Sequence, residues 1–141
     1  MKNTITPKNK HLLTNHCTLD QSLALKEIGF DEPTDYVYGY GGYIVRVGFG
    51  TFKNDPNEDI TSAPTRSEVL QWAREKHGID AWVRPQFDSR LLQLQVVSTS
   101  YVGYYTKGFE VFGKTNNYDT HPEAESALVD KIIEPFKENK E

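Results

Sequence analysis

Apolar residues recur at helical spacing in three separate segments of the chain, and each segment begins with the same polar signal. A threonine is followed three residues later by Glu or Gln, in the pairs Thr18 and Gln21, Thr65 and Glu68, and Thr120 and Glu123. This is the pattern of a capping box, in which the threonine hydroxyl and the Glu or Gln side chain each accept a hydrogen bond from a backbone N–H. We therefore predict helices over about 19–28, 66–77 and 121–134. Gly29 and Gly78 are expected to end the first two helices, and Pro135 the third.

The residues between these helices have the composition of strands and turns. Tyrosine and β-branched residues on both sides of Gly41-Gly42 predict a hairpin over 35–49, because glycine supplies the positive φ of a tight turn. Residues 50–63 predict a polar loop. Proline at position 85 favours the border of a sheet, where a missing N–H is tolerated. Further strands are predicted around 82–87, 92–96, 101–105 and 109–112.

This order of elements predicts an α+β fold, with an antiparallel sheet and about three helices packed mainly on one face. The length of 141 residues is typical of one domain. We expect a flexible N-terminal segment over 1–16, a single domain over 17–135 and a frayed C-terminal tail over 136–141.

Composition and charge narrow the classes of partner. The formal net charge is −4, and residues 79–141 carry seven Lys or Arg against ten Asp or Glu, which disfavours a nucleic-acid partner. The one cysteine, Cys17, excludes an intrachain disulfide and a zinc site with several thiolates.

No apolar run reaches the length of about 18 residues that a membrane helix needs. The N-terminus lacks the apolar stretch of a secretory signal, so we expect a cytoplasmic protein.

No catalytic constellation, cofactor motif or metal-ligand set stands out. The carboxylates of 55–59 resemble the start of a calcium loop, but Ile60 and Arg66 occupy the positions of its glycine and bidentate glutamate. The glycines of 39–42 lack the third glycine of a dinucleotide-binding loop. His16 and Cys17 are adjacent, and adjacent side chains on an extended chain point to opposite faces. We therefore predict no catalytic residue, no metal and no cofactor, and favour a protein that is not an enzyme.

Tyrosines of the predicted hairpin are the candidate binding residues: Tyr36, Tyr38, Tyr40 and Tyr43. The first three are two residues apart, so on a strand their rings project from one face. An exposed row of aromatic rings could stack bases or contact a protein. The same rings could instead pack beneath a helix with their hydroxyls at the rim. Trp72 and Trp82 are predicted to anchor the core.

Three stretches resemble a group of small hypothetical proteins from gut Bacteroidetes and their phages and prophages. They are CTLDQSLALKEIGFDEP over 17–33, APTRSEVLQWAREKHGI over 63–79 and YDTHPEAESALVDKIIE over 118–134. The resemblance covers about residues 17–134 and carries no assigned activity, cofactor or catalytic residue. It implies a bacterial or phage protein in the cytoplasm.

Three hypotheses about function follow. The first is a non-enzymatic binding or accessory protein of a mobile element or phage, which contacts another protein or itself. The second is a weak nucleic-acid-binding domain, because the C-terminal half is predicted as three strands and a helix. The sequence YDTHPEA over 118–124, just before the last helix, resembles the small arm-binding domains of phage integrases. That resemblance is one of fold alone. The third is a small-ligand-binding protein or enzyme with a pocket between the hairpin and the second helix.

Overall fold

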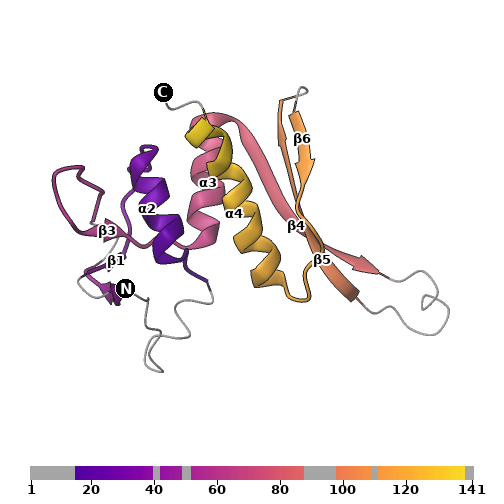
Figure 1. The fold of residues 1–141 in the computed structure, drawn as a ribbon, viewed down its shortest axis with the longest axis horizontal. Helices are drawn as coiled ribbons and strands as arrows, with labels where there is room; N and C mark the ends of the chain where they lie inside the picture. Colours follow the sequence, from indigo (N-terminus) through magenta and orange to yellow (C-terminus); the bar gives the residue numbers. More distant parts are fainter. Residues whose placement is uncertain (1–14, 40–41, 49–51, 88–97, 109–110, 139–141) are drawn as a thin grey trace.

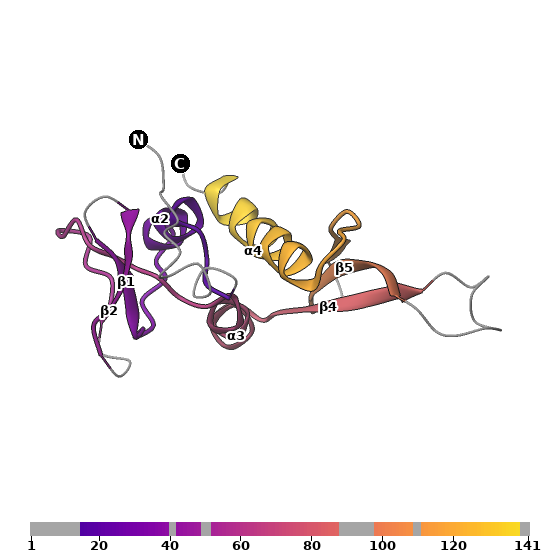
Figure 2. The same cartoon turned by 90° about the horizontal axis from the view of Figure 1, so that it is seen from below.

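Three helices lie side by side between two small antiparallel sheets (Figure 1, Figure 2). A computed structural model describes residues 15–39, 42–48, 52–87, 98–108 and 111–138. The elements in chain order are α2 (Leu19–Glu27), β1 (Tyr36–Tyr38), β2 (Ile44–Arg46), β3 (Thr61–Ser62), α3 (Arg66–His77), β4 (Ile79–Phe87), β5 (Ser98–Lys107), β6 (Val111–Lys114) and α4 (His121–Glu138). The predicted α+β class is confirmed.

All three predicted capping boxes are present. At α3, the Glu68 N–H donates to the Thr65 hydroxyl at 3.1 Å and the Thr65 N–H donates to the Glu68 carboxylate at 2.8 Å. The α2 and α4 boxes show the same reciprocal pair of bonds. Gly78 ends α3 at a left-handed φ of 68°, as the sequence predicts. Local backbone chemistry therefore sets the starts of all three helices.

The first sheet has the strand order β2-β1-β3. β1 and β2 form the predicted hairpin, with Val37 opposite Val45. The prediction of a plain loop over 50–63 is wrong, because Thr61 and Ser62 pair with β1 as β3. The side chain of Asn54 holds this short strand, since it accepts from the Ser62 N–H and donates to the Phe30 carbonyl oxygen.

The second sheet has the strand order β4-β5-β6 and is separate from the first. The strands thus form two sheets, where the sequence predicted one. Pro85 lies in the edge strand β4, opposite Tyr101 of β5, as predicted. α4 packs against one face of β4 and β5. The predicted strand over 92–96 lies outside the described residues.

The largest buried cluster joins all three helices to the start of β4. Its members are Cys17, Leu25, Phe30, Val69, Trp72, Ala73, Ile79, Val129, Ile132 and Ile133. Trp72 is 3% exposed and meets Phe30 edge to face at 5.3 Å between ring centroids, which confirms its predicted place in the core. The helices are therefore held by one continuous apolar core.

The expected end of the third helix at Pro135 is wrong. α4 continues to Glu138 with Pro135 inside it, although proline has no N–H to donate to the carbonyl four residues earlier. Burial explains the continuation, because Phe136 packs against Trp72 and His77 at 6.0 and 4.6 Å between ring centroids. Phe136 therefore belongs to the folded body and not to a frayed tail.

The predicted flexible segment over 1–16 also reaches too far. Asn15 accepts from the Arg66 N–H at 2.8 Å, and His16 is 6% exposed and bridges to Thr65. These long-range contacts fasten both residues to the start of α3. Residues 1–14 lie outside the described part of the chain.

Candidate binding surfaces

Three of the four candidate tyrosines lie in the described residues, and their environments differ. Tyr38 is 4% exposed, and its hydroxyl donates to the Cys17 carbonyl oxygen at 2.6 Å. Tyr36 is half-buried and meets the His16 ring edge to face at 4.8 Å. Tyr43 is 42% exposed, and Tyr40 lies outside the described residues. The hypothesis of one exposed row is therefore corrected, since Tyr38 belongs to the core and Tyr43 to the surface.

Three exposed apolar side chains on the hairpin form what we call the β2 strip: Tyr43, Val45 and Val47. Their exposed fractions are 42%, 49% and 48%. They occupy alternate positions, Val45 within β2 and the other two directly beside its ends, which places them on one side of the extended chain. Ile44 is 6% exposed and packs on Tyr38 and Ala63, whereas Arg46 is exposed. The β2 strip therefore lies on the face opposite Ile44, a face that Val45 shares with its buried partner Val37 of β1, and β2 is an edge among the described strands.

Sequence reasoning named only Tyr43 of the β2 strip. The alternation from position 43 to 47 is readable in the sequence, but it indicates two faces without indicating which one is covered. Valine favours a strand whichever face it occupies, so the sequence does not indicate that Val45 and Val47 are exposed.

A second exposed aromatic group lies on the second sheet. Trp82 is 40% exposed, so its predicted place in the core is wrong. It lies opposite Tyr104 across β4 and β5, and the two rings stack at 5.9 Å with 21° between their planes. The Tyr104 hydroxyl accepts from the Gln86 amide at 2.9 Å. α4 covers the residues on the opposite face, where the ideal Cβ position of Gly103 lies 3.1 Å from the Leu128 Cβ.

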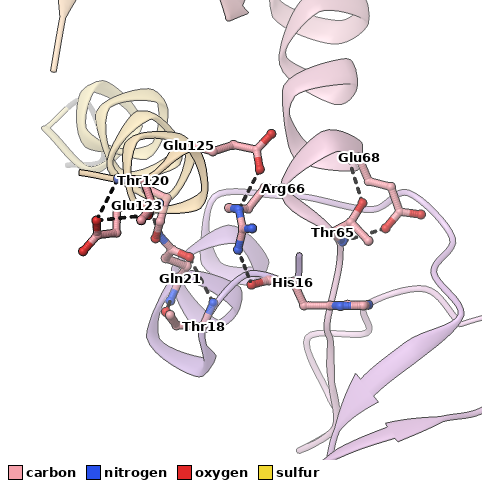
Figure 3. A network of polar contacts seen from close by, with 10 residues as sticks. His16, Thr18, Gln21, Thr65, Arg66, Glu68, Thr120, Glu123 and Glu125 are labelled. Atoms are coloured by element: carbon pink, nitrogen blue, oxygen red, sulfur yellow. Dashed lines mark hydrogen bonds and ion pairs between the residues drawn. The ribbon is translucent and has the colours of Figure 1, made fainter. Parts of the chain in front are cut away.

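A buried ion pair that sequence reasoning missed joins α3 to α4 (Figure 3). The Arg66 Nε lies 2.8 Å from the Glu125 Oε1, with side-chain exposures of 5% and 16%. The Arg66 Nη1 also donates to the His16 carbonyl oxygen at 3.1 Å. The sequence feature that could have indicated this ion pair is the position of Arg66 in the first turn of α3. A cation there interacts unfavourably with the helix dipole, so a partner in another segment is expected. This network is structural, since its polar groups bond to one another.

A polar groove of about 400 Å³ lies between α2 and α4. Gln21 is one of its lining residues. Its Nε2 donates to the Ser126 carbonyl and hydroxyl oxygens and to the Asp130 carboxylate, at 3.0–3.1 Å. Asp20 and Glu134 also line it. No group of three or more potential metal ligands occurs among the described residues.

Cys17 is unsuited to nucleophilic chemistry. Its side chain is fully buried, and burial raises the pKa of the thiol far above its usual range, with only partial opposition from Arg66. The reactive form of cysteine is the thiolate, which burial in an apolar site disfavours. The residue therefore acts as a small apolar side chain of the core.

Comparison with known proteins yields no match to a family model, a curated protein or a solved structure. Among the described residues, no helix has the length and apolar character that spanning a bilayer requires.

Proposed function

We propose that the chain is a non-enzymatic protein-binding module, which contacts another protein or a second copy of itself through the β2 strip. The observation that carries the proposal is the gathering of exposed apolar groups there. Of the six exposed large hydrophobic side chains in the described part of the chain, three form the β2 strip. Apolar side chains collected on one face, next to an edge strand, are typical of surfaces that bind proteins.

The chemistry of the β2 strip favours a protein partner. Val45 and Val47 offer neither a ring for base stacking nor a charge for phosphate, whereas aliphatic groups beside a tyrosine are common at the centre of protein interfaces. Stable interfaces bury roughly 1,200–2,000 Å² in total, which three side chains alone do not supply. We therefore propose that the β2 strip forms the centre of a transient contact, with Kd in the micromolar range.

The resemblance to small proteins of gut Bacteroidetes and their phages supplies the proposed setting. We place the chain in the cytoplasm as an accessory protein of a mobile element or phage. A buried, unpaired Cys17 thiol is compatible with a reducing compartment.

A photo-crosslinking residue at position 45 tests the proposed surface in the native cell. In cells that encode the chain, we expect one dominant crosslinked protein, identified by mass spectrometry, or a crosslinked dimer of the chain. In the double variant Val45→Lys and Val47→Lys, the crosslinking residue is placed at position 43 instead. The two lysines should abolish this crosslinking, and they should change the free energy of unfolding by less than about 0.5 kcal/mol because both valine side chains are exposed.

Leu23→Lys is the matched control, because Leu23 is 47% exposed but lies on α2. It should leave crosslinking unchanged. Crosslinks that survive the double lysine variant would exclude the β2 strip as the contact. A double variant that unfolds would show instead that the two valines belong to the core.

A second candidate function, weak binding of single-stranded nucleic acid, is favoured by the Trp82–Tyr104 stack on the outer face of the second sheet. Bases stack on exposed aromatic rings of such sheets. Arg84 lies two residues from Trp82 and is exposed, as is Lys114 opposite Tyr104. The described elements of the C-terminal half follow the order β4, β5, β6 and α4.

Fluorescence anisotropy of a labelled 20-nucleotide oligo(dT) tests this candidate. Binding at 20 mM NaCl that weakens about tenfold at 200 mM, and that Trp82→Ala abolishes, would support it. An unchanged anisotropy at low salt would exclude it, as would binding that Trp82→Ala leaves intact.

A further inference from the structure

A small apolar pocket of about 210 Å³ lies where the last turns of α4 meet the start of β4 and the end of β5. Figure 1 shows the C-terminal part of α4 beside the start of β4. Ile79, Tyr105, Ile132 and Phe136 supply its apolar walls. The second sheet, whose β4 and β5 contribute to this pocket, lies on the other side of the helices from β1 and β2 (Figure 1, Figure 2). The pocket is therefore separate from the proposed protein contact.

The walls are held in place by the core. Ile132 is 1% exposed and Ile79 is 8% exposed, and the Phe136 ring packs on Trp72 and His77. The Tyr105 ring lies over Gly113, where the missing Cβ leaves room for it: an added Cβ would lie 2.2 Å from the ring carbon Cζ. A pocket with such supported walls exists before a ligand arrives, which lowers the entropic cost of binding.

The charged groups at this pocket are all of one sign. Lys107 and Lys131 line it, and no acidic side chain is among its described lining residues. His77 lies directly behind Phe136. Burial lowers the pKa of His77, and the positive charge of Lys107 lowers that pKa further. Lys107 therefore acts electrostatically on a ring that packs against the Phe136 wall of the pocket.

We propose that this pocket binds a small organic carboxylate with an apolar ring or short chain, the carboxylate meeting Lys107 and Lys131 and the apolar part resting on Ile132 and Phe136. Pockets for drug-sized ligands measure roughly 300–1,000 Å³, so this smaller one suits a ligand of about ten non-hydrogen atoms. Bare inorganic anions do not fit, because the apolar walls cannot replace their water. The ligand class is assigned by this combination of apolar walls and paired cations.

Phenylacetate and phenylacetamide are the matched pair of probes, because they have nearly the same shape and differ in charge. We expect saturable shifts of backbone amide NMR signals from phenylacetate, with Kd on the order of 1 mM for a ligand of this size. The shifts should map to Lys107, Ile132 and Phe136. Phenylacetamide should bind at least tenfold more weakly, and inorganic phosphate should give no saturable shift at these residues.

Lys107→Gln combined with Lys131→Gln removes both charges and keeps similar side-chain length. This variant should weaken phenylacetate binding at least tenfold and leave phenylacetamide binding unchanged, while Lys53→Gln, an exposed lysine outside the pocket, should change neither. Equal affinity for the two probes in the unmodified chain would overturn the proposal, as would shifts scattered over other surfaces or phenylacetate binding that survives the double variant.

Discussion

At the scale of single residues, burial decides the chemistry of groups that look reactive in the sequence. Cys17 and Tyr38 both have raised pKa values, and burial is the main cause in each. The Tyr38 hydroxyl, which could have served a binding surface, is used inside the fold by its bond to the Cys17 carbonyl oxygen. The environment of a side chain, which depends on distant segments, therefore determines its role.

The burial of Cys17 predicts a thiol that reagents reach only when the chain opens. In native buffer, we expect Ellman's reagent to react with Cys17 at least about 1,000-fold more slowly than in 6 M guanidinium chloride. The reason is that only a small fraction of a domain of ordinary stability is unfolded at any moment, and the thiol is accessible only in that fraction. Absorbance at 412 nm follows the reaction. Rapid stoichiometric labelling of the native protein would contradict the packing of residues 15–17 against α3.

His77 predicts a pH dependence of stability. Its pKa lies below the ordinary value of 6.5, first because of burial and then because of Lys107, although the helix dipole at the end of α3 favours the charged form. Above pH 6.5 His77 is neutral in both states. As the pH falls through 6.5, the unfolded chain takes up the proton first, so the free energy of unfolding decreases until the pH passes below the pKa of the folded state.

Urea unfolding at pH 7.5 and pH 5.0 measures this effect, with His77→Phe as the matched variant that keeps the ring contacts with Trp72 and Phe136. The unmodified chain should lose more stability than the variant, by at most about 1 kcal/mol because the ring is partly exposed. A His77 pKa above 6.5, measured by NMR, would show that the dipole prevails.

At the scale of elements, glycine controls how closely α4 lies on the second sheet. An alanine Cβ at position 103 would lie 3.1 Å from both the Leu128 Cβ and the Thr115 Cγ2. Gly103 also donates its N–H to the Thr115 hydroxyl at 2.9 Å. Because Leu128 is fully buried, it has little room to move, and the helix rather than one side chain must shift to admit a methyl group.

Gly103→Ala should therefore lower the free energy of unfolding by about 1–3 kcal/mol through overpacking. Urea unfolding measures the change. Gly39→Ala is the control and should change stability by less than about 0.5 kcal/mol, because no atom lies within 4 Å of its added Cβ. Equal stability of Gly103→Ala and the unmodified chain would show that α4 does not contact β5 as closely as described.

At the scale of the whole molecule, the Arg66 network ties three distant segments together. Arg66 bonds to Glu125 of α4 and to the carbonyl oxygens of Asn15 and His16. A buried ion pair adds little when compared with apolar residues of the same size, but removing one partner leaves a buried charge uncompensated. The network therefore specifies how α3, α4 and the N-terminal segment meet.

Arg66→Met should lower the free energy of unfolding by about 3 kcal/mol, because Glu125 then lacks its partner. Adding Glu125→Leu should restore part of the loss, and urea unfolding of all four members of this double-mutant cycle measures the coupling. Lys76→Gln is the control, because Lys76 lies 3.9 Å from Glu32 in an exposed pair and should contribute less than about 0.5 kcal/mol. Equal losses from Arg66→Met and Lys76→Gln would refute the importance of the buried pair.

Local chemistry within a few residues was readable from the sequence by itself. The threonine caps, the left-handed Gly78, the hairpin of β1 and β2 and the edge position of Pro85 all follow from hydrogen bonds and dihedral limits inside short segments. For that reason the α+β class and the order of the helices could be predicted.

Only the tertiary structure decided which faces are covered. It formed β3 from two residues that carry no strand pattern, carried α4 through Pro135 by packing Phe136, split the tyrosines between core and surface, and exposed Trp82. Periodicity marks the two faces of a strand or helix equally, and burial of either face depends on elements far away in the chain. The β2 strip and the lysine-lined pocket arise in the same way, because each is assembled or uncovered by contacts that no short segment contains.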